Sequence, residues 1–156
     1  GPEMAAEFKQ KFPEGKEANF YRPDPASTLY CLDHWSKPVT FAGWEVGNLI
    51  FTGGAYLKSK LSSKNPVYRA YELYNNFAGR PSWDQVAVYL LREEARNYFS
   101  AGDEGYCKVF KDGSNEWVTG PRTNHQYVKL RSKSTAAEIG KLMDDMVKQS
   151  KKQKKK

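Results

Sequence analysis

The sequence predicts an α/β fold: a partial Rossmann-like layered domain with a small, mostly parallel sheet, covering helices and a C-terminal antiparallel hairpin. Three observations support this prediction. Residues 65–90 hold two amphipathic helical patterns. A short run of β-branched and aromatic residues at 37–44 follows an earlier helical pattern, as strands do in α/β units. After residue 98 come short strand-like runs, two of which are separated by Lys-Asp-Gly-Ser at 111–114, which indicates a hairpin.

Length and composition favour one globular domain. The chain has 156 residues, of which 39% are hydrophobic and 14% aromatic, too many for a disordered protein. No apolar run approaches the roughly 20 residues that span a bilayer, and no signal peptide is recognisable. We therefore expect an intracellular, cytoplasmic location. Residues 1–3 begin with Gly-Pro, typical of a protease-cleavage scar, and the domain is expected over residues 4–147.

The net charge of +7 is concentrated at the C-terminus. Lys148 and the five lysines after it supply nearly all of it, so the remaining chain is close to neutral. Residues 148–156 are predicted to be a disordered Lys-rich tail. Such a tail either acts as a solubilising segment or binds nucleic acid or anionic surfaces weakly and without specificity. No aromatic residues interleave with these lysines, which argues against a specific single-strand site.

A short helix is expected over residues 4–12, and a second helix begins after Asp24 and runs through Trp35. Asp24 is expected to cap it, with Pro25 at the first helical position. The apolar stripe of this helix consists of Leu29, Leu32 and Trp35.

Cysteine and histidine give no metal or nucleophile pattern. Cys31 and Cys107 are far apart, and neither has a metal ligand at usable spacing, so we expect two thiols in a reducing compartment. His34 and His125 lack a neighbouring nucleophile or second histidine, which favours surface or capping roles.

The two central helices share residues 65–90. Asn65 is expected to cap the first helix and Gly79 to end it. Ser82 is expected to cap the second, with Asp84 in its first turn, where the helix dipole favours an acid without any catalytic role. The predicted inward stripe of the first helix consists of Val67, Ala70, Tyr71 and Tyr74.

The run Trp83-Asp84-Gln85-Val86-Ala87 resembles a His-Asp-x-x-Ala motif of the inosine-uridine preferring nucleoside hydrolases. These calcium-dependent enzymes cleave the N-glycosidic bond of ribonucleosides. The resemblance implies that Asp84 is a calcium ligand. It also implies that Trp83 lies near the leaving base, where many members carry the histidine.

A second stretch resembles the same family. Glu17-Ala18-Asn19 is similar to its Glu-x-Asn loop, and Asp24-Pro25 to the helix start that follows. The resemblance implies that Glu17 and Asn19 contact the ribose hydroxyls. Ala18 stands where the family usually has Phe, and one extra residue precedes Asp24.

The resemblance runs from Glu17 to about Val147 and covers the C-terminal half of the family's domain. The N-terminal aspartate cluster that binds calcium and activates water in the family is absent here. Calcium takes roughly six to eight oxygen ligands, and Asp84 supplies one. We therefore expect no cofactor for the chain by itself, and calcium only where another chain completes the site.

Three functional hypotheses follow. The first is a nucleoside-hydrolase-like domain, catalytically inactive alone (a pseudoenzyme), that serves in binding or as a structural or interaction module. The second is a subunit of a split or oligomer-completed ribonucleoside N-glycosidase. The third is a basic-tailed protein that binds nucleic acid or a membrane surface. A half-domain would expose a sheet edge and apolar surface, so self-association or a partner chain covering that face is also expected.

Overall fold

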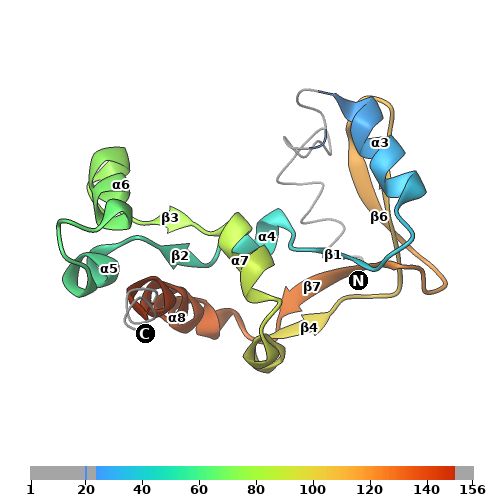
Figure 1. Cartoon of the computed structure of the whole chain (residues 1–156). Helices are drawn as coiled ribbons and strands as arrows, with labels where there is room; N and C mark the ends of the chain where they lie inside the picture. Colours follow the sequence, from blue (N-terminus) through green and yellow to red (C-terminus); the bar gives the residue numbers. More distant parts are fainter. Residues whose placement is uncertain (1–19, 21–23, 150–156) are drawn as a thin grey trace, which may run out of the picture. The chain divides into compact units, whose positions relative to one another are not determined.

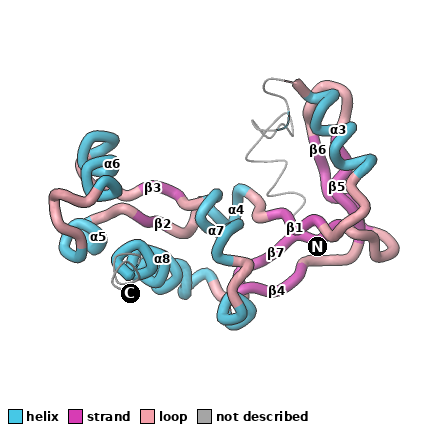
Figure 2. The backbone as a smooth tube through the Cα atoms, viewed as in Figure 1, coloured by secondary structure: helices cyan, strands magenta, loops and turns pink. Residues whose placement is uncertain are grey.

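The structure is a computed structural model that describes residues 20 and 24–149. The chain divides into two compact units. Unit 1 comprises Gly1–Glu45 and Ala101–Lys129, and unit 2 comprises Val46–Ser100 and Leu130–Lys156. Both contain helices and strands, and the predicted α/β class is confirmed, with a small mixed sheet and antiparallel hairpins (Figures 1 and 2).

Unit 1 begins with helix α3 (Pro25–His34), which starts as predicted. The Asp24 side chain accepts the N–H of Ala26 at 3.0 Å, and Pro25 occupies the first turn. The predicted stripe is only partly covered: Leu29 and Leu32 are half-buried, whereas Trp35 is 56% exposed.

The remaining elements of unit 1 are strands. The predicted hairpin is present as β5 (Gly105–Val109) and β6 (Asn115–Thr119), which pair antiparallel around the Asp-Gly turn. Strand β1 (Val39–Phe41) pairs in parallel with β7 (His125–Leu130). The order of this sheet is β1-β7-β4, where β4 is Phe99–Ala101. Asn124 reinforces this pair, because its Nδ2 donates to the carbonyl oxygens of Trp35 and Lys37.

Unit 2 contains most of the helices. Its elements, or the parts of them that it includes, are α4 (Trp44–Gly47), β2 (Phe51–Thr52), α5 (Ala55–Lys60), α6 (Pro66–Asn75), β3 (Arg80–Pro81), α7 (Trp83–Tyr89), the 3-10 helix η1 (Glu93–Asn97), β4 (Phe99–Ala101), the 3-10 helix η2 (Lys133–Thr135) and α8 (Ala136–Gln149). The buried hydrophobic side chains of its core include Ile50, Leu57, Val86, Tyr89, Ile139 and Met143.

Helix α8 packs directly on strand β2, as Figure 1 shows. Gly140 permits this approach. A Cβ atom built on Gly140 would lie 2.2 Å from the carbonyl oxygen of Phe51, which is backbone and has little freedom to move. The absence of a side chain at Gly140 therefore sets the distance between helix and strand.

Helix α6 begins as predicted but ends earlier. Asn65 caps it by accepting the N–H of Val67 at 2.8 Å. The helix ends at Asn75, because Asn76 and Phe77 adopt left-handed backbone conformations, with φ of 50° and 61°. This reversal buries the Phe77 ring against Tyr68, with ring centroids 4.7 Å apart. The expected stop at Gly79 is therefore wrong by several residues.

The predicted inward stripe of α6 is only half correct. Val67 and Tyr71 are half-buried, but Ala70 is exposed and Tyr74 is 61% exposed. Leu73 on the same helix is 70% exposed. Helix α6 therefore contributes few side chains to the core and leaves several apolar ones in contact with solvent.

Helix α7 is short and is followed by the separate η1. Val86 and Tyr89 face the core, whereas Val88 is 68% exposed and Leu91, just beyond the helix, is 87% exposed. Within residues 20 and 24–149, no helix is long and apolar enough to cross a membrane.

Candidate functional site

Asp84 lies in the first turn of α7, as predicted, and is exposed. Only Ser82 separates the helix from strand β3, so Asp84 stands three residues beyond the last residue of that strand. An exposed carboxylate in this position has oxygen atoms accessible to an added cation. The role of Asp84 as a calcium ligand, which the family resemblance implies, stays a prediction, and the carboxylate is one ligand group.

The start of α7 is fixed by Ser82 in a manner that the sequence did not predict. The Ser82 hydroxyl makes no capping bond; it bonds to Thr52 Oγ1 at 2.9 Å. The Ser82 N–H donates to the carbonyl oxygens of Gly47 and Ile50. These bonds of the fully buried Ser82 attach the beginning of α7 to the segment from the end of α4 to strand β2.

Trp83 is half-buried against Gly47. A Cβ on Gly47 would lie 2.4 Å from Trp83 Cδ1 and 2.7 Å from Trp83 Cα, so only glycine allows the tryptophan to lie here. The Trp83 side chain therefore packs directly on the backbone of Gly47, and Asp84 is the next residue in the chain.

A chain of hydroxyl groups continues from Ser82 into α6. Thr52 Oγ1 bonds both to Ser82 and to the Tyr71 hydroxyl, at 2.9 and 3.1 Å. Gln85 Nε2 donates to the same Tyr71 hydroxyl at 3.5 Å. Side-chain hydrogen bonds therefore join β2 and α6 to Ser82 and Gln85, the two residues on either side of Trp83-Asp84.

Arg80 is the residue near this site that the sequence analysis missed. Its guanidinium carbon lies 5.0 Å over the Tyr74 ring and 5.9 Å over the Trp83 ring, and its Nη1 donates to the Tyr74 hydroxyl. Arg80 and Tyr74 are exposed. The sequence signal was weak: an arginine three residues before a tryptophan indicates little until the reversal at Asn76 brings Tyr74 close.

A second acidic feature of unit 2 has a structural role. Asp144 on α8 is only 4% exposed and its Oδ1 accepts the N–H of Gly53 at 3.1 Å. Burial raises the pKa of Asp144 to about 6, against the opposing effect of the Gly53 N–H, and the charge of Asp145 adds to the increase. Asp145 accepts the Tyr56 hydroxyl, and this bond raises the tyrosine's pKa.

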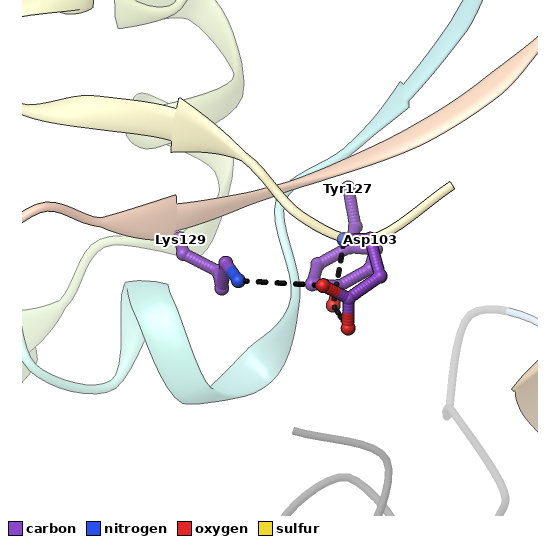
Figure 3. A network of polar contacts seen from close by, with 3 residues as sticks. All are labelled: Asp103, Tyr127 and Lys129. Atoms are coloured by element: carbon purple, nitrogen blue, oxygen red, sulfur yellow. Dashed lines mark hydrogen bonds and ion pairs between the residues drawn. The ribbon is translucent and has the colours of Figure 1, made fainter. Parts of the chain in front are cut away.

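The polar groups of unit 1 also have structural partners. Tyr127 accepts the N–H of Asp103 and donates to its carboxylate, and Lys129 Nζ lies 3.8 Å from the other carboxylate oxygen (Figure 3). His125 Nδ1 accepts the N–H of Cys107 at 3.2 Å. Burial raises the pKa of the Cys107 thiol to about 12, so Cys107 is not a thiolate nucleophile at neutral pH.

Glu17 and Asn19, the residues predicted to contact ribose, lie outside the described residues. Their proximity to Asp84 therefore stays a prediction. Among the residues that the structure describes, no three His, Cys, Asp or Glu side chains form a group able to hold a metal ion. In that part of the chain, the calcium ligand set implied by the resemblance consists of Asp84.

Comparison of the chain with models of protein families, with curated proteins and with solved structures found no match. The functional assignment therefore depends on the motif and on the geometry around Asp84, Trp83 and Arg80.

Proposed function

We propose that the chain is a nucleoside-hydrolase-like domain that serves in binding or as an interaction module and does not catalyse hydrolysis by itself. The observation that supports this most is the position of Asp84. It is exposed in the first turn of α7, next to Trp83, whose ring is held against Gly47. The Asp-x-x-Ala order at the helix start is similar to the family motif, with Trp83 in place of its histidine.

The number of ligands argues against catalysis by this chain alone. Calcium prefers roughly six to eight oxygen ligands, several of them carboxylates. Hydrolysis of an N-glycosidic bond needs a positioned water, a base to activate it and stabilisation of a cationic sugar. Asp84 supplies one carboxylate and no base for a metal-bound water, so the proposed role is binding without turnover.

A second candidate is a subunit of a split enzyme, whose missing acids come from another chain. Two apolar side chains favour it. Val88 on the Asp84 helix and Leu91 just beyond it are 68% and 87% exposed. Exposed apolar side chains next to an incomplete polar site are typical of surfaces that a partner covers.

The experiment measures the binding of calcium and of inosine by calorimetry, and ribose release from inosine or uridine by a coupled assay. The wild type is compared with Asp84→Asn and with Asp33→Asn, a matched change at an exposed aspartate on α3. We expect a calcium Kd on the order of millimolar or weaker, further weakened by Asp84→Asn only, and no ribose release from any of the three.

Two results would change the assignment. Tight calcium binding with ribose release that Asp84→Asn abolishes would replace the first candidate with the split enzyme. Calcium binding that Asp84→Asn leaves unchanged, together with no binding of a nucleoside, would remove both candidates.

A further inference from the structure

Helices α5 and α8 of unit 2 pack against each other (Figure 1) and carry exposed lysines. Residues 53–71, which include α5, contain four cationic and no acidic side chains. We define the basic surface by five exposed lysines, of which two lie on α5, one in the loop after it and two on α8: Lys58, Lys60, Lys64, Lys141 and Lys148. The two on α8 are separated by two helical turns and so lie on the same side of the helix.

Lysines from both helices lie over one aromatic ring. Lys60 Nζ is 5.0 Å and Lys141 Nζ is 5.8 Å from the centroid of the Tyr56 ring. Attraction between a cation and the face of a ring holds each ammonium group there. The ring therefore concentrates two positive charges that repel each other, and an anion bound beside them would relieve this repulsion.

The acids close to these lysines are engaged on the inner side of the same helices. Asp144 is buried and accepts the N–H of Gly53, and the half-buried Asp145 accepts the Tyr56 hydroxyl. Within residues 20 and 24–149, none of the five lysines of the basic surface forms an ion pair with a carboxylate. The positive charges are thus exposed, whereas the neighbouring negative charges already have donors of their own.

The sequence continues this charge beyond α8. The helix ends at Gln149, and the seven residues that follow it include five lysines. The folded part of unit 2 therefore supplies cations in fixed positions, and the segment that follows α8 adds more of the same sign. Charge complementarity favours a partner with many regularly spaced negative charges.

The side chains around the lysines decide which polyanion fits. Firm attachment to a membrane takes a second signal besides cations, such as apolar side chains that enter the bilayer, and the described residues of α5 and α8 present no large exposed apolar side chain. Single-stranded nucleic acid stacks its bases on accessible aromatic rings. Here two ammonium groups lie over the ring of Tyr56, and Phe77, under Lys58, is buried. Double-stranded nucleic acid needs only cations that neutralise phosphates and release counterions.

From these observations we infer that the basic surface binds the phosphate backbone of double-stranded nucleic acid without reading the base sequence. Lys60 and Lys141 contact phosphates, and Tyr56 positions both ammonium groups. The lysines after Gln149 add affinity to this contact. The inference does not depend on whether the chain binds nucleosides.

The test measures binding of the purified full chain to a fluorescently labelled DNA duplex of mixed sequence by anisotropy, at salt concentrations from about 50 to 200 mM. The first variant combines Lys60→Gln with Lys141→Gln, which removes both charges on the Tyr56 ring. A second combines Lys60→Arg with Lys141→Arg and keeps them. The matched control combines Lys108→Gln with Lys111→Gln.

This control changes two exposed lysines of unit 1, one of which also lies over a ring: Lys108 Nζ is 4.7 Å from the centroid of the Phe110 ring. We expect the Lys60/Lys141 glutamine pair to reduce the slope of log K against log salt by about 2, since each lost phosphate contact removes about one. The arginine pair and the control should keep the slope of the wild type.

A second background separates the basic surface from the C-terminal segment. In the full-length chain with glutamine in place of the five lysines after Gln149, the Lys60/Lys141 glutamine pair should again reduce the slope by about 2. Circular dichroism checks the fold of each variant. If the pair lowers the melting temperature, Lys58→Gln combined with Lys64→Gln takes its place, with the same expected loss.

Three results would overturn the inference. The first is a slope that the Lys60/Lys141 glutamine pair leaves unchanged in either background, or that the control reduces equally. The second is tighter binding of the single strand of the same sequence than of the duplex at equal salt. The third is binding through Lys60 and Lys141 to vesicles of phosphatidylserine and phosphatidylcholine but not to the duplex, which would make this a membrane-binding surface.

Discussion

At the scale of single residues, Asp144 shows how burial changes the chemistry of an acid. The side chain is 4% exposed and accepts one backbone N–H, from Gly53. Burial raises its pKa from 3.8 to about 6. The charged form is therefore less favourable in the folded protein than in the unfolded chain. The side chains of Tyr56, Asp145 and Lys141 also lie at this part of α8: the Tyr56 hydroxyl donates to Asp145, and Lys141 Nζ lies over the Tyr56 ring.

This pKa predicts a pH-dependent effect of Asp144→Asn. As the pH rises from about 4 to above 6, the unfolded chain ionises Asp144 first, so the wild type loses stability over this window. Asparagine can still accept the Gly53 N–H but carries no charge. The free energy of unfolding of Asp144→Asn relative to wild type should therefore rise between pH 4.5 and pH 7.5, measured by urea unfolding.

The control for this comparison is Glu104→Gln, a change at an exposed acid of unit 1. Its difference from wild type should vary much less with pH. A difference between Asp144→Asn and wild type that is the same at both pH values would show that Asp144 has an ordinary pKa in the folded protein.

At the scale of elements, the contact between α8 and β2 predicts the effect of Gly140→Ala. Alanine is favoured over glycine in a helix by about 1 kcal/mol. Here its Cβ would lie 2.2 Å from the Phe51 carbonyl oxygen, so helix and strand must separate. We expect a net loss of about 1 kcal/mol or more in the free energy of unfolding, measured by denaturant titration.

Gly120→Ala is the matched control, because no heavy atom lies within 4 Å of a Cβ built there and its φ is not left-handed. That substitution should be neutral or slightly stabilising. If the two substitutions change the free energy of unfolding equally, α8 does not pack closely against the backbone of Phe51 at Gly140.

Elements with local signals were predicted well from the sequence. The Asp24-Pro25 and Asn65-Pro66 pairs mark helix starts, because both the cap and the proline act within one turn. The end of α6 was missed because burial of Phe77, a tertiary effect, forces two non-glycine residues into the left-handed region. Strands β2 and β3 have two residues each, too few to show periodicity.

The sequence predicted part of the candidate site, as it predicted part of the fold. The place of Asp84 in the first turn of α7 follows from local sequence and is confirmed. The contacts of Arg80 with Tyr74 and Trp83 were not predictable, since they depend on the reversal at Asn76 and on the space that Gly47 leaves. Sequence patterns locate side chains on their own element and do not locate partners across a turn.

At the scale of the whole molecule, the Lys-rich C-terminus gives a third prediction, although residues 150–156 lie outside the described part. Deleting Ser150–Lys156 removes five lysines and leaves a formal net charge of +2. The segment has no apolar side chain to bury, so the melting temperature should hardly change. Binding to DNA or anionic vesicles should weaken, and the remaining binding should depend less steeply on salt.

A full-length variant with glutamine in place of these five lysines separates the loss of charge from the loss of length, and it should behave like the deletion. Sequence-selective binding that survives the deletion and does not depend on salt would contradict a purely electrostatic role for the tail.

The division into units also has a consequence for synthesis on the ribosome. The chain passes between the units after Glu45, Ser100 and Lys129, so neither unit is a continuous piece of sequence. Strand β1 meets its parallel partner only at residues 125–127, and β2 meets α8 only after residue 136. Each unit therefore remains incomplete until these later residues have left the ribosome. Until then the apolar side chains that β7 and α8 cover have no packing partner in the growing chain, so neither unit can complete its core earlier.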